Sequence, residues 1–143
     1  MPEKKERGTQ MKIYFAGSIR GGREDRELYS RLIAYMSTGH RVLTEHIGHP
    51  VLEESGSDGD IYRQDTAWLR ECDLVIAECT RPSLGVGYEL AYAERYGKPV
   101  HILYNTERTR LSAMLTGNPA FYLHPYTEEA DLFPLVDRIL GNG

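Results

Sequence analysis

Short apolar runs alternate with amphipathic segments along most of this chain, and this alternation is the strongest constraint on its fold. We expect strands in five apolar runs, at residues 11–18, 40–45, 73–80, 99–105 and 120–126. We expect helices where apolar side chains recur at helical spacing, at residues 24–38, 60–72, 88–96, 111–115 and from Leu132 to Leu140.

Strands that alternate with helices predict an α/β fold with a doubly wound, mostly parallel five-stranded sheet. At 143 residues the chain is flavodoxin-like in size, so we expect a Rossmann-like three-layer sandwich. Residues 1–10 are polar and without periodicity, which indicates a flexible tail, and residues 11–143 then form one domain.

Composition narrows the possible partners. The formal charge of −4 argues against binding of a nucleic acid polymer, which requires a basic surface. No apolar run is long enough for a membrane span or a signal peptide. The two cysteines, Cys72 and Cys79, lack the spacing of a metal site and indicate reduced thiols of a cytoplasmic protein.

Ligands of such sheets bind at the carboxyl ends of the strands, where this chain carries two glycine-rich stretches. The first, "GSIRGG" at 17–22, could bring backbone N–H groups, Ser18 and Arg20 close to an anion. It matches neither the Walker motif nor the dinucleotide fingerprint, and a simple tight turn explains it equally well.

The second stretch, "SLGVGYE" at 83–89, combines Ser83, Gly85 and Gly87 with Glu89 at the expected start of a helix. The partial positive charge of a helix N-terminus favours an anion and keeps a nearby carboxylate ionised. On position alone, a solvated glutamate in the first helical turn is the better explanation of Glu89. A nucleophilic carboxylate is the alternative.

Asp65 gives weight to the second interpretation. It lies four residues after Ile61 and three before Trp68, which places it on the apolar, inward face of its helix. Burial would raise its pKa, as a proton donor requires, although a bond to a neighbouring strand end would also explain it. A carboxyl pair of unequal pKa is typical of glycosidic chemistry, and Tyr14 could orient Glu89.

The histidines give a weaker signal. His46 ends the second expected strand and could line a pocket for a base, or could equally cap the strand or lie on the surface. The other histidines share no ligand spacing, so we expect no metal site; they are His40, His49, His101 and His124.

Several stretches together resemble the 2′-deoxynucleoside 5′-monophosphate N-glycosidases of the nucleoside 2-deoxyribosyltransferase superfamily. The likeness extends from Ile13 to about Leu140, and its most specific combination is "SIRGGRED" with "PSLGVGYE". The other matching stretches are "YFAGS", "VLTEH", "QDTAWLRECDLVIAE" and "LSAML". The resemblance implies hydrolysis of the N-glycosidic bond of a deoxynucleoside monophosphate by residues 11–143, without metal or organic cofactor.

The resemblance also implies roles for individual residues. Glu89 matches the nucleophile that forms a covalent deoxyribosyl intermediate, Asp65 the acidic residue that assists departure of the base, and Tyr14 the tyrosine that positions the nucleophile. The matched substrate-binding residues are Gly17, Ser18, Ile19, Arg20 and Gly21 in the first loop, and Ser83, Gly85 and Gly87 at the phosphate. The family is homodimeric, and Ser112, with Met114 close by, matches a serine that reaches the phosphate in the neighbouring subunit.

The chain departs from the animal members in residues 47–59, a stretch that we expect to border the base. For a retaining mechanism we expect the two carboxyl groups about 5–5.5 Å apart. Three rival functions stay open: a nucleoside 2-deoxyribosyltransferase, a glycosidase of ribonucleoside monophosphates such as CMP, and a nucleotide-binding module without catalysis.

Overall fold

The computed structural model of the chain describes residues 10–19, 22–45 and 56–141. Within them a five-stranded sheet has the order β2-β1-β3-β4-β5, and each neighbouring pair is parallel. The strands are β1 (Lys12–Gly17), β2 (Arg41–Val42), β3 (Leu74–Glu78), β4 (Val100–Asn105) and β5 (Phe121–Tyr126). The predicted doubly wound sheet is confirmed, and the order is that of flavodoxin-like folds. The expected tail lies outside the described residues, apart from Gln10.

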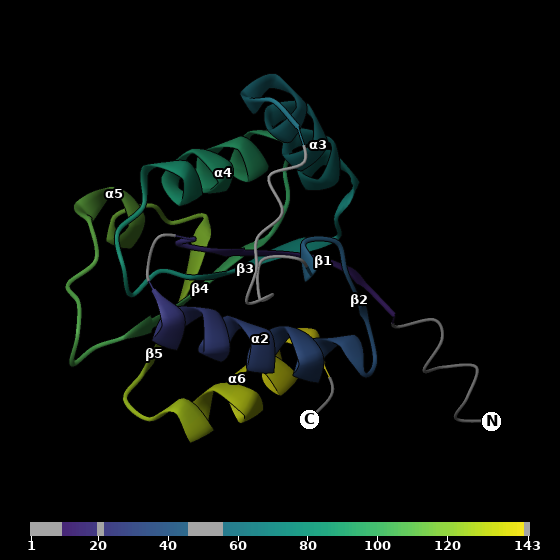
Figure 1. Ribbon diagram of the computed structural model, residues 1–143. Coiled ribbons are helices and arrows are strands. Elements are labelled where there is room, and N and C mark those ends of the chain that lie inside the picture. Colours follow the sequence, from purple (N-terminus) through teal and green to yellow (C-terminus); the bar gives the residue numbers. More distant parts are fainter. Residues whose placement is uncertain (1–9, 20–21, 46–55, 142–143) are drawn as a thin grey trace.

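Helices cover both faces of the sheet, which gives three layers (Figure 1). One face carries α2 (Arg23–Ser37) and α6 (Leu132–Leu140), which follows the short 3₁₀ helix η2 (Glu129–Asp131). The other carries α3 (Asp58–Glu71) and α4 (Leu84–Arg95), and the short α5 (Ala113–Thr116) lies beside β5. None of the described helices is long and apolar enough to cross a membrane.

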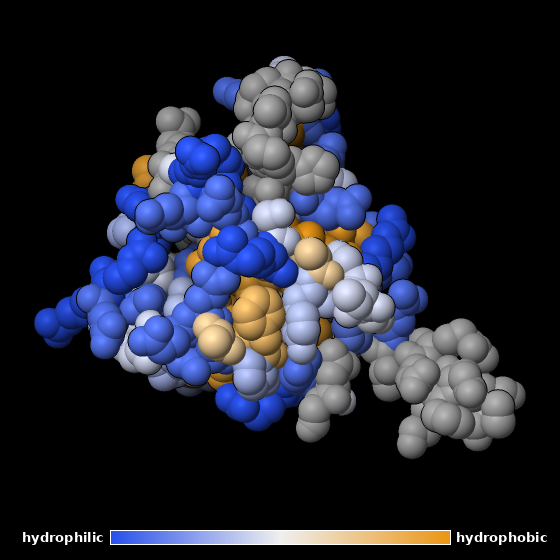
Figure 2. All heavy atoms as spheres, turned by 60° about the horizontal axis from the view of Figure 1, so that its bottom comes forward, coloured by the Kyte–Doolittle hydropathy of each residue, from blue (hydrophilic) through white to orange (hydrophobic). Residues whose placement is uncertain are grey.

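Alternation along β1 divides the core into two clusters. Ile13 and Phe15 pack with α2 and α6, whereas Tyr14 and Ala16 face α3 and α4, because successive side chains of a strand point to opposite faces. The helices turn most of their apolar side chains inward, and the face toward α2 and α6 is hydrophilic around a central group of hydrophobic atoms (Figure 2). Tyr14 therefore lies on the face that α4 covers.

Strand β2 is shorter than the sequence predicts. Residues 40–45 were expected to be extended, but only Arg41 and Val42 pair as a strand. Beyond Val42 the side chain of Thr44 replaces the backbone pairing. Its Oγ1 accepts a hydrogen bond from the Phe15 amide at 2.9 Å and donates one to the Phe15 carbonyl at 2.7 Å. One hydroxyl thus satisfies both backbone groups that a longer strand would have paired.

Helix α4 begins four residues before the predicted start at Tyr88. Ser83 is its N-cap, and the Ser83 Oγ accepts a hydrogen bond from the amide of Val86 at 3.2 Å. A serine cap stabilises a helix by about 1 kcal/mol, enough to offset a glycine of poor helix propensity. Gly85 and Gly87 therefore lie inside the first turn of α4, without positive φ, and not in a separate loop.

Gly17 ends β1 against the ring of Tyr29 on α2. A Cβ at Gly17 would lie 2.7 Å from two ring atoms of Tyr29, whose side chain is buried. The Tyr29 hydroxyl in turn accepts a hydrogen bond from the Ser18 amide at 3.2 Å. The absence of a side chain at Gly17 thus lets α2 approach the first loop closely.

We expect Gly17→Ala to destabilise the protein by about 1–3 kcal/mol, because the buried Tyr29 ring has little room to move. Gly87→Ala is the matched control. A Cβ there meets no atom within 4 Å, and alanine favours a helix by about 0.5–1 kcal/mol, so this variant should be slightly more stable. Urea unfolding of both variants measures the difference, and equal effects would contradict the packing argument.

Candidate active site

A hydrogen bond joins Tyr14 and Glu89 across the interface between sheet and helix. The Tyr14 hydroxyl donates to Oε2 of Glu89 at 2.6 Å, between residues 75 positions apart in the sequence. Tyr14 is completely buried in β1, and Glu89 is half-buried in the second turn of α4. The early start of α4 therefore removes the interpretation of Glu89 as a solvated glutamate in a first turn.

The surroundings of Glu89 shift its protonation equilibrium. Burial is the largest effect and, with the nearby charge of Asp65, raises the pKa of Glu89 to about 7, while the hydrogen bond from Tyr14 acts in the opposite direction. The sequence predicted that the helix charge favours an ionised Glu89, but here burial acts in the opposite direction. Both protonation states are populated near neutral pH, which suits a group that must gain and lose negative charge.

Asp65 lies near this pair. It is half-buried on α3, and its negative charge raises the pKa of both Glu89 and Tyr14. The predicted inward face of α3 holds for Leu69, which is fully buried, but not for Ile61, which is 43% exposed. The apolar face of this helix therefore covers its second half only. The raised pKa of Asp65 itself stays a prediction, as does the separation of the two carboxyl groups.

The first predicted loop is described in part. Ser18, directly after β1, is only 4% exposed, whereas the neighbouring Ile19 is 49% exposed. Gly17 and Ser18 are fixed by their contacts with Tyr29. Arg20, Gly21 and His46 lie outside the described residues. The exposed Ile19 therefore offers an apolar contact at the carboxyl end of β1.

The second predicted stretch, residues 83–89, forms the N-terminus of α4, where two glycines leave the backbone without side chains. Gly85 and Gly87 are exposed, and a Cβ at Gly85 would meet only the Ser83 Oγ, at 3.9 Å. Their contribution is the missing side chain and not unusual backbone angles. Amide groups of a first helical turn bind anions well when no side chain covers them.

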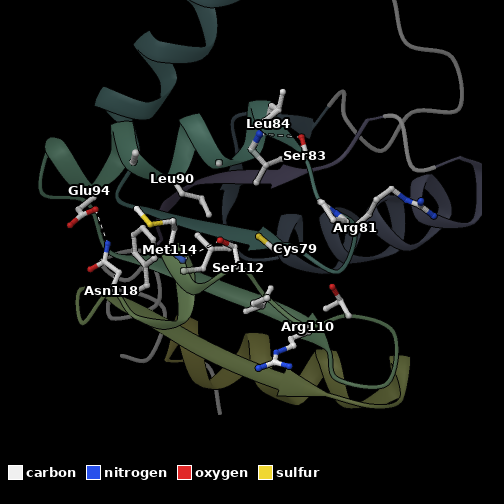
Figure 3. A pocket seen from close by; sticks show the side chains of 18 residues that line it. Cys79, Arg81, Ser83, Leu84, Leu90, Glu94, Arg110, Ser112, Met114 and Asn118 are labelled. Atoms are coloured by element: carbon white, nitrogen blue, oxygen red, sulfur yellow. Dashed lines mark hydrogen bonds between the residues drawn. The ribbon is translucent and has the colours of Figure 1, made fainter.

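A cavity of about 790 Å³ opens beside this helix end, and four predicted residues line it (Figure 3). They are Ser83 and Gly87 of α4 and, across the cavity, Ser112 and Met114 of α5. Ser112 caps α5 by accepting a hydrogen bond from the amide of Met114 at 3.1 Å. Met114 is 80% exposed. Tyr14, Asp65 and Glu89 do not line this cavity, but Glu89 lies on α4 two residues after Gly87, which does.

Sequence reasoning missed a buried polar network at the carboxyl end of β3. Glu78, the last residue of β3, is buried and accepts hydrogen bonds from the Thr80 hydroxyl and, at 2.7 Å, from the Tyr126 hydroxyl. Burial raises the pKa of Glu78, and these hydrogen bonds oppose that rise. The signal in the sequence was a glutamate inside the apolar run 73–80. Thr80 ends the same run, whereas Tyr126 comes from the distant β5.

The geometry supports covalent or acid–base chemistry. A carboxylate oriented by a buried tyrosine, with a second carboxyl group nearby, can attack a carbon centre that develops positive charge. The adjacent helix end can hold an anionic part of the ligand. Within the three described ranges, no group of three or more His, Cys, Asp or Glu residues could hold a metal ion.

Comparison with known proteins gives a consistent result. The sequence profile of nucleoside 2-deoxyribosyltransferases matches residues 13–125. A 5-hydroxymethyl-dUMP N-hydrolase of Mus musculus is 48% identical over 126 residues, which cover 82% of this chain and 73% of the relative. A protein of Syntrophotalea carbinolica, provisionally named 2′-deoxynucleoside 5′-phosphate N-hydrolase 1, is 41% identical over 135 residues, covering 92% of this chain and 95% of the relative.

Among solved structures, the CMP N-glycosidase BcmB of Clostridium botulinum superposes with a TM-score of 0.69. The match covers 90% of this chain and 98% of that protein, at 19% sequence identity. This likeness confirms the α/β fold. At such low identity it says nothing of the ligand.

The raised pKa of Glu89 predicts a stability that depends on pH. The folded protein holds the Glu89 proton more tightly than the unfolded chain, so stability should fall as the pH rises from about 4.5 to about 7. Glu89→Gln removes this effect and keeps an acceptor for Tyr14. The variant should therefore be more stable than the parent protein by about 1–3 kcal/mol at pH 8, and nearly equal to it at pH 4.

Urea unfolding at the two pH values measures this difference. Glu94→Gln is the control, since Glu94 is exposed on the same helix and glutamine can still accept the hydrogen bond from Asn118, so the change in stability should be small. A gain for Glu89→Gln that is equal at pH 4 and pH 8 would contradict the assignment.

Proposed function

The chain belongs to the nucleoside 2-deoxyribosyltransferase family, and on that basis we propose that it is an N-glycosidase of 2′-deoxynucleoside 5′-monophosphates. The products are the free base and 2-deoxyribose 5-phosphate. The observation that carries the proposal is the hydrogen bond between Tyr14 and Glu89, because it presents one carboxylate oxygen in a fixed orientation at the carboxyl end of the sheet. We take residues 11–143 as one catalytic domain, since a single sheet draws its strands from Lys12 to Tyr126.

Glu89 is the proposed nucleophile. Its ionised oxygen attacks C1′ as the bond to the base breaks, and positive charge that builds on the sugar ring favours the anionic form. A covalent ester between Glu89 and deoxyribose results, and water then cleaves it. Tyr14 donates its hydrogen bond to Oε2 and so holds the carboxylate during both steps.

Asp65 is the proposed acid and base of the cycle. As an acid it protonates the departing base, and as a base it accepts a proton from the water that attacks the ester. Its influence on the pKa of Glu89 supports this role, because two groups that exchange protons with one substrate must lie close together. The proton taken from water restores the protonated form of Asp65 before the next turnover.

The phosphate binds away from the reacting bond. We propose that Ser83 and the backbone at Gly85 hold it at the N-terminus of α4, and that Gly87, whose amide donates to the Ser83 carbonyl at 3.1 Å, leaves room for it by lacking a side chain. The first loop contributes Gly17, Ser18 and Ile19 together with Arg20 and Gly21, and His46 contacts the base. Binding energy gained at the phosphate then orients C1′ over Glu89, two residues after Gly87.

We further propose a homodimer in which Ser112 reaches the phosphate of the neighbouring subunit, with Met114 close by. The exposed apolar side chains at the cavity rim support such an interface: Leu84 is 96% and Met114 80% exposed. Within one chain Ser112 also lines the same cavity as Ser83, so a contribution to its own site is the alternative. Buried free thiols at Cys72 and Cys79 fit a cytoplasmic enzyme.

The substrate class can be tested with a panel of deoxynucleoside and ribonucleoside monophosphates and unphosphorylated deoxynucleosides, assayed for release of the base. We expect hydrolysis of the deoxynucleoside monophosphates, with 5-hydroxymethyl-dUMP as the first compound to try, because the mouse relative bears its name. Glu89→Gln should lower kcat by at least about a thousandfold, since it removes the nucleophile, while ligand binding persists.

The rival functions predict other results. Transfer of the sugar to an added base, with equal turnover of unphosphorylated nucleosides, would identify a transferase. Preferential cleavage of CMP would identify a ribonucleotide glycosidase, as named for the structural neighbour. Binding of monophosphates without release of any base would leave only a nucleotide-binding module.

Mixed dimers can test the role of Ser112. We expect Ser112→Ala alone to raise KM for the monophosphate, and Glu89→Gln alone to be inactive. If Ser112 acts in the neighbouring site, a mixed dimer of Glu89→Gln and Ser112→Ala subunits has one site that lacks both groups and one intact site. It should then show half the parent activity with the parent KM. A mixed dimer that keeps the raised KM would place Ser112 in its own subunit's site.

A further inference from the structure

The proposed substrate site needs two loops to keep a fixed separation. One loop leaves β1 toward α2 and the other leaves β3 toward α4, from neighbouring strands but toward opposite faces of the sheet. Such a switch point opens a crevice in which ligands bind. A contact that bridges the two sides would set the width of the crevice.

Arg81 and Asp25 make such a contact. Arg81 lies in the loop after β3, two residues before the Ser83 cap, and Asp25 lies in the first turn of α2. The Arg81 Nε donates to Oδ2 of Asp25 at 2.9 Å. The Asp25 side chain is only 9% exposed, against 45% for that of Arg81, so water weakens this ion pair less than one whose two groups both lie on the open surface.

The β1 loop is attached to the same helix. The Ser18 amide donates to the Tyr29 hydroxyl, and the bare Gly17 packs on the Tyr29 ring. Tyr29 lies one turn after Asp25 on α2. Helix α2 therefore holds the first loop through Tyr29 and the second loop through Asp25.

The β3 loop is also fixed at its base. The Thr80 side chain donates to the buried Glu78 and accepts a hydrogen bond from the Asn105 amide at 2.9 Å. Arg81 thus extends from an anchored residue. Arg81 also lines the cavity that Ser112 and Met114 line, and in Figure 3 the end of its side chain extends away from Ser83 and Ser112. The ion pair with Asp25 holds the guanidinium at α2.

We propose that Arg81 is a positioning residue whose ion pair with Asp25 sets the separation of the two substrate-binding loops. The inference deepens the proposed function and rests on it for its kinetic consequence. It assigns Arg81 no contact with the substrate. Loss of the pair lets the loops move apart, so that the phosphate at Ser83 no longer brings C1′ to Glu89.

The experiment compares Arg81→Gln, Asp25→Asn and the double variant with the parent protein, using 5-hydroxymethyl-dUMP as substrate. We expect each single variant to lower kcat/KM about tenfold, because misplacement of a bound substrate is costly, and the double variant to be no worse than either single one. Arg108→Gln is the matched control. Its Nη2 lies 3.8 Å from the other Asp25 oxygen and its side chain is similarly exposed, but it follows β4 and connects neither loop, so kcat/KM should change less than twofold.

Hydrogen exchange of the free protein gives a second measurement that does not depend on activity. Amides of residues 17–19 and 84–87 should exchange about tenfold faster in Arg81→Gln than in the parent, and at the parent rate in Arg108→Gln. Because this measurement uses Arg81→Gln, it tests the ion pair even if Asp25→Asn folds poorly. If the parent protein shows no activity, the proposed function is wrong, but the exchange rates still test whether the ion pair holds the two segments.

Two results would overturn the inference. If Arg81→Gln weakens turnover while a well-folded Asp25→Asn does not, Arg81 contacts the substrate directly. If Arg81→Gln leaves both kcat/KM and the exchange of the two segments unchanged, the ion pair does not position the loops.

Discussion

Burial of Glu89 against Tyr14 is the constraint on which the rest of the site depends. A carboxylate removed from water is unstable unless donors and charges compensate, and here one hydroxyl compensates only in part. The pKa of Glu89 therefore lies near 7, between that of a surface glutamate and that of an acid kept neutral. The fold tolerates this group because β1 and α4 hold it between them.

The two faces of the sheet carry different polar groups. Tyr14, on the side of α3 and α4, faces the carboxylate of Glu89, whereas Glu78 faces the other side and anchors the loop that leads into α4. Both depend on the alternation of a strand, which sends neighbouring residues in opposite directions. The pair of Tyr14 and Glu89 and the network around Glu78 thus lie on opposite faces of the sheet. A substitution in one layer can leave the packing of the other intact.

Local patterns were sufficient for the architecture and for part of the site. Apolar runs located all five strands, and motif resemblance pointed to Tyr14 and Glu89, which the structure joins by a hydrogen bond. Local propensity failed where another interaction outweighed it: the Ser83 cap started α4 within a glycine-rich stretch. The pair between Asp25 and Arg81 could not have been foreseen, because its partners are 56 residues apart and each is ordinary in its own segment.

The Thr44 hydroxyl has a consequence for how the chain can vary. The Thr44 hydroxyl pairs with both the amide and the carbonyl of Phe15, so no further backbone pairing is needed at this edge of the sheet. An exchange of the residues after Glu45 between relatives would therefore have to keep Thr44 as the junction.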